Sequence, residues 1–436
     1  MRARQRAVLP CTVFGVCALV YVLTLGNRIL TTSPDNHYLH LANSWLHGEL
    51  AVLGDRPPGS NDWALYQGRW YVSFPPLPAL IVLPAVALAG GTALPDCLFW
   101  ALIAALGPAL LFVLLRSLRE RGRSERSERD DLVLTGLFAF GSVYYFVAVQ
   151  GSVWFAAHVV ACPLLILYLL HALGARQPLL AGVFLGLAFL TRPPTLLAAL
   201  FFLLEALAQA RPADTPPVGS GSHVLVRARR WLGAVCWRAS VRPLALFTLP
   251  LLAVGLFSAG LNLARFDDPF EFGHTYLQVA WRGRIDTWGL FNYHYFARNL
   301  AVFATALPWL SIHAPYLTIG RHGLALWFTT PQLLWLLWPA RVPSTSVALY
   351  LSAAAIAIMD LCYQNSGWIQ FGYRFATDYL PLLFGLLALS GRRFGPGFHA
   401  LMVFALIVNL FGAVTFDRMP EFYDTDLTQR VIFQPD

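Results

Sequence analysis

The residues best suited to chemistry lie just after the first long apolar run, where Asp35 follows Ser33 and Pro34. Ser33 is a favourable N-cap, Pro34 suits the first position of a helix, and Gly48 suits its left-handed C-terminal position. Asp35 then falls in the first turn, where the helix dipole favours an ionised carboxylate. Such a carboxylate can accept a proton from a hydroxyl or hold a metal ion, although acidic residues also occur at helix starts for structural reasons alone.

The predicted helix after Asp35 has a polar and an apolar face. Polar side chains recur at intervals of four, three and four residues: Asn36, His40, Asn43 and His47. Apolar side chains occupy the other face: Leu39, Ala42, Leu46 and Leu50. This pattern predicts a helix that lies in the membrane interface. A solvated surface explains the polar face, and a substrate or metal contact by His40 is the alternative.

Two arginines stand where apolar runs begin or end. Arg374 precedes an apolar run, and a guanidinium there needs an anionic partner, either a phosphate group or Asp378 one helical turn later. Arg192, between two short apolar runs, presents a similar case for phosphate binding. His158 lies inside an apolar run, which is typical of a histidine packed within a helical bundle, with substrate contact as the alternative.

Two polar stretches rich in aromatic residues contain the remaining candidates. In the first, Asp62 is either a solvated loop residue or a second acid, and Tyr66 is typical of an interfacial anchor. In the second, Glu271 and Arg282 stand among aromatic residues. This mixture fits a surface that binds sugars or lipid head groups, and it fits an interfacial cap equally well.

The composition indicates an integral membrane protein. Hydrophobic residues make up 57% of the 436 residues and charged residues 12%, whereas soluble proteins carry about 25% charged residues. The apolar runs are about 15 to 22 residues long and continuous, which suits helices that cross a core of about 30 Å rather than strands of a β-barrel. The six cysteines include no Cys-x-x-Cys pair, which argues against a disulfide framework or a zinc site. We therefore expect an all-α integral membrane protein.

Arginine-rich segments set the expected orientation, because such segments stay in the cytoplasm. Arg2, Arg4 and Arg6 place the N-terminus inside. The basic segment 116–131 then also lies inside, provided that Phe74–Gly91, with its four prolines, lies at the interface instead of crossing. The net charge of +8 then reflects topology and not nucleic-acid binding. About eleven crossings follow, the first of them an uncleaved helix: 8–30, 96–115, 132–149, 153–173, 178–192, 194–209, 243–264, 324–338, 344–363, 375–391 and 397–416.

The chain is expected to form a single membrane domain over residues 1–436. Three segments are predicted outside the cytoplasm: the first loop 31–95, the second loop 265–320 and the tail 417–436. The segment 210–242 is predicted inside, flexible around its prolines and with a surface helix near 227–238.

The order of these features resembles the GT-C superfamily of polytopic glycosyltransferases, in its bacterial family 39-like branch. That branch is related to protein O-mannosyltransferases and aminoarabinose transferases. The resemblance extends over nearly the whole chain and is carried by five features: Asp35, Tyr66–Ala79, Arg265–Gly273, Thr329–Pro331 and Gln370–Arg374.

The resemblance implies an inverting transfer of a sugar from a polyprenyl-phosphate carrier to a glycan, lipid or protein at the periplasmic face of a bacterial inner membrane. Asp35 would deprotonate the acceptor or hold Mg²⁺ or Mn²⁺, and Arg374, with Tyr373 and Arg192, would bind the lipid phosphate. Asn36 stands where many relatives have a second acid, which puts metal dependence in doubt. A flippase or transporter of lipid-linked sugars is an alternative, although no internal repeat is visible. A carrier-binding homologue without catalysis is another.

Overall fold

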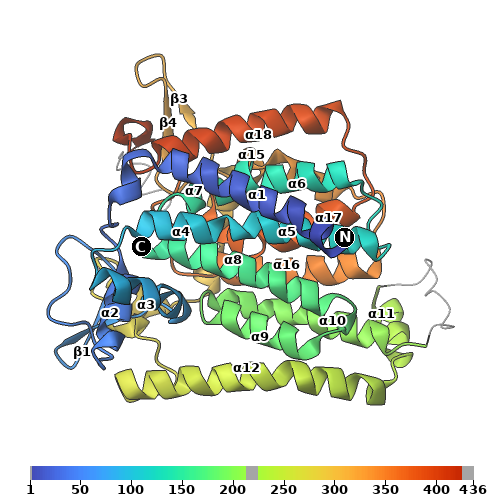
Figure 1. The fold of residues 1–436 in the computed structure, drawn as a ribbon, viewed down its shortest axis with the longest axis horizontal. Coiled ribbons are helices and arrows are strands. Elements are labelled where there is room, and N and C mark those ends of the chain that lie inside the picture. Colours follow the sequence, from blue (N-terminus) through green and yellow to red (C-terminus); the bar gives the residue numbers. More distant parts are fainter. Residues whose placement is uncertain (1, 213–223, 425–436) are drawn as a thin grey trace.

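The computed structural model describes residues 2–212 and 224–424, most of which are helical. The longer helices lie side by side along the longest axis of the molecule (Figure 1). Six helical segments are long and apolar enough to cross a membrane: α1 (Arg2–Leu25) with η1 (Gly26–Leu30), α4 (Asp96–Ala104) with α5 (Leu106–Glu120), α8 (Val153–Ala172), α12 (Trp237–Phe266), α16 (Ser344–Leu361) and α18 (Pro396–Thr415). The predicted class, an all-α polytopic membrane protein, is confirmed.

Shorter helices account for the other predicted crossings. Three are continuous: α9 (Pro178–Phe189), η3 with α10 (Pro193–Gln209) and α17 (Leu380–Leu389). Two are interrupted: α6 (Glu128–Phe140) with α7 (Tyr144–Ala148), and α15 (Leu326–Thr329) with η6 (Pro331–Leu337). The first break follows Gly141, and the second falls at Pro331, which has no N–H for a continuous helix. Together with the six long segments they match the eleven predicted spans.

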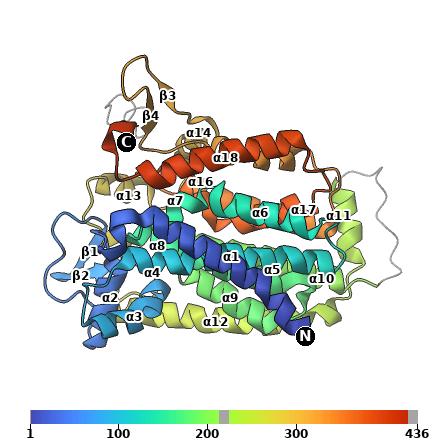
Figure 2. The same ribbon diagram turned by 45° about the horizontal axis from the view of Figure 1, so that its top comes forward.

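The two ends of the bundle differ in their charge. The N-terminus and α11 (Val224–Gly233) lie at one end, and α2 (His37–Leu46) and β1 (Trp63–Tyr66) lie at the other (Figures 1 and 2). Arg123, after α5, forms an ion pair of 2.7 Å with Glu205 near the end of α10. The arginine-rich connection 116–131 and the described residues 224–242 thus lie at the same end of the bundle, as the predicted topology requires. Residues 213–223, predicted to be flexible, and 425–436, part of the predicted tail, lie outside the described residues.

Two glycines set the close approach of α9 to α12. Gly182 and Gly186 are four residues apart and face the same neighbour. A Cβ atom at Gly182 would clash with the carbonyl oxygen of Phe247, and one at Gly186 would lie 2.9 Å from the side chain of Val254. Small residues at this spacing let the backbones of membrane helices pack closely.

The first loop forms a small layer over one end of the bundle. It contains α2, a hairpin of β1 (Trp63–Tyr66) and β2 (Arg69–Val72), and α3 (Leu77–Ala89) packed against α2. The hairpin turn has positive φ at Gln67 and Gly68, as a tight two-residue turn requires. At 13 residues α3 is about 20 Å long, shorter than the hydrocarbon core, which fits its predicted place at the interface.

The second loop and the end of the described chain cover the same side. The second loop contains α13 (Arg282–Trp288) and α14 (Phe296–Thr305), and near its start the N–H of Gln278 donates to the Trp63 carbonyl at 3.0 Å. The second sheet joins three short strands: β3 (Trp309–Leu310), β4 (Leu317–Gly320) and β5 (Tyr423–Asp424). All three predicted outer segments therefore meet at one end.

The start of α2 differs from the prediction. The helix begins at His37 with Asn36 as its N-cap, so Ser33 is not the cap and Pro34 is not the first helical residue. Asp35 therefore precedes the helix and, contrary to the prediction, does not lie in its first turn. Instead, the N–H and hydroxyl of Ser33 donate to Asp96 at 2.7 and 2.5 Å. This tertiary contact draws Ser33 out of the helix. Gly48 has φ +76°, the left-handed conformation predicted for it.

Candidate active site

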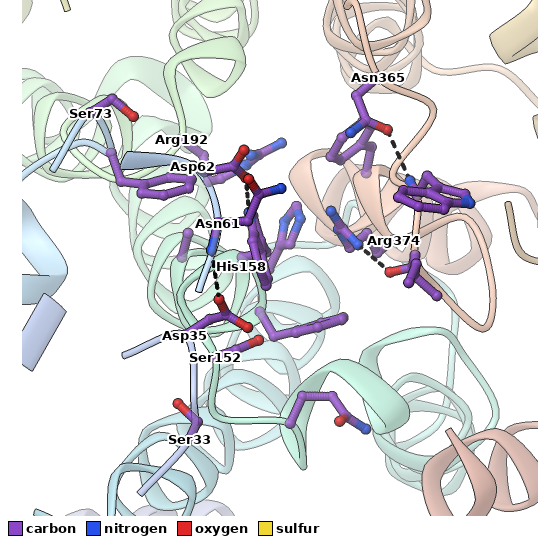
Figure 3. A pocket seen from close by; sticks show the side chains of 18 of the residues that line it. Ser33, Asp35, Asn61, Asp62, Ser73, Ser152, His158, Arg192, Asn365 and Arg374 are labelled. Carbon is purple, nitrogen blue, oxygen red and sulfur yellow. Dashed lines mark hydrogen bonds between the residues drawn. The ribbon is translucent and has the colours of Figure 1, made fainter. Parts of the chain in front are cut away.

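A cavity of about 920 Å³ lies at the end of the bundle that carries the outer loops. Its walls come from segments that are far apart in the sequence, including the first loop, α8, the Thr191–Pro194 turn and η7 (Arg374–Asp378). Five of the residues singled out from the sequence line it: Asp35, Asp62, His158, Arg192 and Arg374. Figure 3 shows the two carboxylates on one side, Arg374 on the other and His158 between them.

The two carboxylates form the acidic wall of the cavity. Asp35 is partly buried and accepts a long hydrogen bond of 3.4 Å from the N–H of Asn61, while Asp62 accepts one of 2.8 Å from the Trp154 indole. Burial raises the pKa of Asp35. Burial, and then the nearby charge of Asp35, raise the pKa of Asp62 to about 6. Asp62 is therefore not the solvated loop residue that its surroundings in the sequence favoured.

His37, which the sequence did not single out, holds this acidic wall in place. Its ring is fully buried and stacks on Trp63 at 4.0 Å, and its Nε2–H donates to the Asn61 carbonyl at 2.7 Å. Burial lowers the pKa of His37 to about 4, so the ring is neutral. Because Asn61 bonds to both His37 and Asp35, the first turn of α2 helps to fix the loop residues that precede β1, Asp62 among them.

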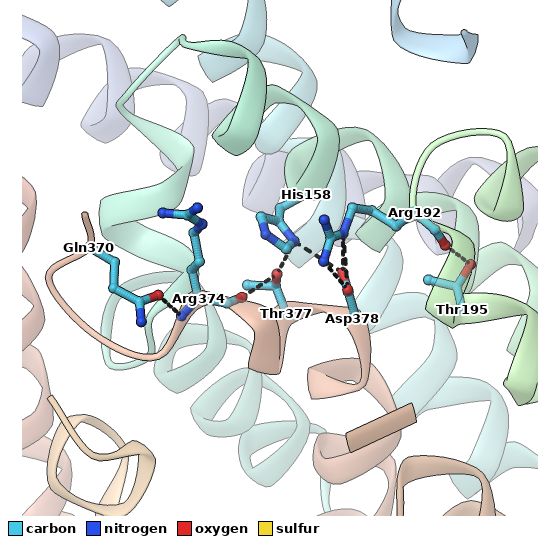
Figure 4. Close-up of polar contacts among 7 residues, drawn as sticks. All are labelled: His158, Arg192, Thr195, Gln370, Arg374, Thr377 and Asp378. Carbon is cyan, nitrogen blue, oxygen red and sulfur yellow. Dashed lines mark hydrogen bonds and ion pairs between the residues drawn. The ribbon is translucent and has the colours of Figure 1, made fainter. Parts of the chain in front are cut away.

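A buried cluster behind the cavity joins Arg192, Asp378 and His158 (Figure 4). Arg192 donates through Nε and Nη2 to the Asp378 carboxylate at 3.0 and 2.6 Å. Nδ1 of His158 lies 3.0 Å from Asp378 and 2.6 Å from the Thr377 hydroxyl. Asp378, one of the two predicted partners for Arg374, is thus the partner of Arg192. It offsets the positive charge of that arginine.

Arg374 occupies the opposite wall and is only 5% exposed. Its Nη1 donates to the carbonyls of Gly367 and Ile369 at 2.6 and 2.8 Å, and its guanidinium lies 5.1 Å from the ring of Phe155. Within residues 2–212 and 224–424 it forms no ion pair, and its Nε has no hydrogen-bond partner. A buried cation without a counter-ion is costly, so this position is suited to bind an anion.

The other residues predicted to contact substrate do not line the cavity. Tyr373 is buried against Phe303 and Phe375, and His40 lies against the edge of Trp63. Tyr66, Glu271 and Arg282 interact with residues of the loops. Their partners are as follows: Asp267 for the Tyr66 hydroxyl, Gly273 and Thr275 for Glu271, and Asp286 for Arg282. The interpretation of Tyr66 as part of the cap fits this position.

The structure adds charged residues that the sequence analysis left out. Asp360 near the end of α16 lines the cavity, is 2% exposed, and has no partner for Oδ2 among the described residues. An acid inside an apolar run is itself a signal of function, and it was available in the sequence. Arg28, at the end of η1, also lines the cavity and pairs with Asp417 at 3.0 Å. Arg28 stands at the outer edge of the first apolar run, so the rule that singled out Arg374 applies to it as well.

The acidic wall offers two carboxylates to a metal ion. In the part of the chain that the structure describes, no group of three or more His, Cys, Asp or Glu side chains is placed to hold one. Asp35 and Asp62 nevertheless offer two neighbouring carboxylates. Mg²⁺ is commonly held by one or two carboxylates together with water and substrate phosphate, so this pair fits such an ion.

The helical bundle with its cavity under the outer loops is similar in fold to solved structures of ArnT. One of these is ArnT from Cupriavidus metallidurans bound to undecaprenyl phosphate, which matches with a TM-score of 0.53 and 16% identity. The match covers 91% of this chain, which spans 63% of the length of ArnT. ArnT in the apo state also matches, at a TM-score of 0.44 and 14% identity, over 92% of this chain and 62% of that one. No family model and no curated protein matches.

Proposed function

We propose that the chain is a glycosyltransferase that moves a sugar from a polyprenyl-phosphate carrier to an acceptor hydroxyl. One observation carries the proposal: a cavity joins the Asp35 and Asp62 carboxylates with a buried arginine, Arg374, that has no counter-ion among the described residues. A polyprenyl-phosphate sugar has an anionic group beside the bond to be broken and an apolar tail for the bilayer. The fold neighbour was crystallised with undecaprenyl phosphate, which supports a carrier of this class.

In the proposed reaction the acceptor oxygen attacks the anomeric carbon as the bond from that carbon to the phosphate oxygen breaks. Asp35 takes the proton of the acceptor hydroxyl. Its raised pKa makes it a stronger base than an ordinary carboxylate. Arg374 binds the phosphate, where negative charge increases as the carrier departs. Attack from the side of the sugar opposite the phosphate inverts the anomeric centre, and it needs base and anion site on opposite walls (Figure 3).

A divalent cation fits the proposal as a ligand of Asp35 and Asp62. Bound there, Mg²⁺ or Mn²⁺ would supply positive charge at the wall where the acceptor hydroxyl gives up its proton. Asp62 would otherwise serve as a hydrogen-bonding group for substrate at the same wall. Treatment with a chelator, followed by return of each metal, separates the two roles, because only the metal role predicts loss and recovery of transfer.

We place the cavity on the outer face of a bacterial inner membrane, with the N-terminus in the cytoplasm and the C-terminus in the periplasm. The support is the gathering of arginine-rich connections at the end opposite the cavity. Asp55→Cys is introduced into a variant whose six native cysteines have been replaced. A membrane-impermeant thiol reagent should label this protein in intact spheroplasts. Labelling only after lysis would reverse the assignment.

The function is tested by transfer of radiolabelled sugar from polyprenyl-phosphate donors in proteoliposomes. Asp35→Asn should lower the rate by roughly 10²- to 10⁴-fold, the usual contribution of a general base, without loss of folded protein. The control is Asp55→Asn, an exposed carboxylate of the same loop. Full activity of Asp35→Asn would refute the base. Label that crosses the bilayer unchanged would indicate a flippase, and carrier binding without transfer would indicate a non-catalytic homologue.

The rate should also depend on pH in a defined direction. Since burial raises the pKa of Asp35, the base is protonated at a higher pH than an ordinary carboxylate. Transfer should therefore decline as the pH falls through a midpoint above the usual value of 3.8. A rate that stays constant down to pH 4 in a stable protein would contradict the assignment.

A further inference from the structure

His158 has one ring nitrogen fully engaged and the other without a partner. It belongs to α8, is 1% exposed and lines the cavity. Nδ1 contacts Asp378 and Thr377 at 3.0 and 2.6 Å, whereas the buried Nε2 has no hydrogen-bond partner among the described residues. A buried polar atom without a partner lowers stability, so a group that enters the cavity and bonds to this nitrogen gains a favourable contact.

The hydrogen bonds around Nδ1 define the tautomer. The Thr377 hydroxyl donates its single hydrogen to the Arg374 carbonyl at 2.7 Å, so its oxygen is an acceptor toward His158. The Asp378 carboxylate receives hydrogen bonds from Arg192 and is also an acceptor. With two acceptors beside it, Nδ1 carries the proton (Figure 4). In the neutral ring Nε2 is then a hydrogen-bond acceptor.

A hydrogen-bond acceptor at Nε2 of His158 favours a ligand group that can donate a hydrogen bond. A phosphate dianion offers only acceptor oxygens, so it suits Arg374 and does not suit Nε2 of a neutral His158. A hydroxyl group supplies the missing donor. His158 lies between the carboxylates and Arg374, where the sugar must sit if the base and the phosphate act on opposite faces of its anomeric carbon (Figure 3).

We propose that Nε2 of His158 accepts a hydrogen bond from one hydroxyl of the transferred sugar and so contributes to the choice of sugar. Asp378 and Thr377 act as positioning residues that hold the ring in the tautomer required. The inference rests on the proposed function and adds to it a group that recognises the sugar.

The test uses a series of donors, each lacking one hydroxyl of the sugar that the wild type transfers. With the wild type, kcat/KM for one deoxy donor should be roughly 10- to 100-fold lower than for the full donor. With His158→Phe, which has no acceptor, kcat/KM for the same two donors should be nearly equal. His171→Phe, at the other end of the same helix, is the control and should behave as the wild type. Equal penalties in the wild type and His158→Phe at every position would overturn the inference.

A second measurement, NMR of the wild-type protein, tests the proposal even if His158→Phe does not fold. Protein labelled with ¹⁵N-histidine should show a His158 signal with protonated Nδ1 and unprotonated Nε2, and the Nε2 shift should change when donor is added. Thr377→Val, which removes one acceptor, should weaken that tautomer preference. A protonated Nε2 in the free protein, or no change with donor, would overturn the proposal. Transfer that proceeds without sensitivity to His158 defeats this inference alone, whereas absence of transfer with any donor defeats the proposed function as well.

Discussion

Replacing Asp62 by asparagine is expected to make the protein more stable at neutral pH. The position tolerates the change, since Asp62 has φ +63°, a left-handed conformation that asparagine adopts readily, and an amide oxygen can still accept from Trp154. Burial is the main cause of the raised pKa of Asp62, so the fold disfavours the charged form. Asparagine removes that charge.

The magnitude follows from the pKa. A rise from 3.8 to about 6, at 1.36 kcal/mol per pKa unit, corresponds to at most about 3 kcal/mol, because Asp62 keeps some contact with solvent. A raised pKa in the fold contributes stability that is fully present below about pH 4 and is lost as the pH rises through about 6. Asp62→Asn should therefore exceed the wild type in stability above pH 6 and match it near pH 4.

The assay is thermal unfolding of purified protein in one detergent between pH 4 and pH 8. The expected gain at pH 7.5 is a few degrees in Tm, and it should shrink steadily as the pH falls. Asp55→Asn, in the exposed part of the loop, should show no such pattern. An Asp62→Asn protein that is less stable than the wild type at pH 7.5 would refute the reasoning. Sugar transfer measured on the same samples would show whether the destabilising charge of Asp62 is needed for activity.

The remaining predictions concern the two arginines and the helix contact. Arg374→Gln should lower kcat by roughly 100- to 1000-fold with little change in Tm, because no carboxylate loses its partner. Arg192→Gln should instead destabilise the protein by about 3 kcal/mol, since it leaves Asp378 buried without its arginine, and equal losses of Tm in the two variants would contradict this. Gly182→Ala should lower stability by about 1–3 kcal/mol, because its methyl group meets the backbone of α12, while Gly255→Ala, with open space around it, should not. Unfolding of both glycine variants at the same temperature would show that the close contact is unimportant.

Sequence reasoning worked where the cause is local. The bilayer selects continuous apolar runs, so composition and run length define the class of protein and the approximate spans without knowledge of neighbours. A single charge at the edge of such a run needs an anion, so Arg374 could be singled out with its two possible partners. Gly48 could be placed in the left-handed region because that preference belongs to the residue itself.

The partner of each charged or hydrogen-bonding side chain could be found only from the tertiary structure. Arg192 and Asp378 are 186 residues apart in the chain, and their pairing decides that Arg374 is the arginine left for an anion. Ser33 lost its predicted role as a helix cap because Asp96, 63 residues away, accepts its hydrogen bonds.

Burial likewise came only from packing. The sequence favoured a solvated loop residue at Asp62, whereas the fold places it against Trp154. The rise in the pKa of Asp62 comes first from burial by neighbouring segments, which only the fold brings together. The sequence by itself thus determined the membrane class and named Asp35 and Arg374. The tertiary structure decided which charges share one cavity, which of them compensate each other, and which polar atoms, such as Nε2 of His158, remain for a ligand. Hydrophobic patterning is a property of each segment, whereas electrostatic pairing and desolvation are properties of the assembled chain.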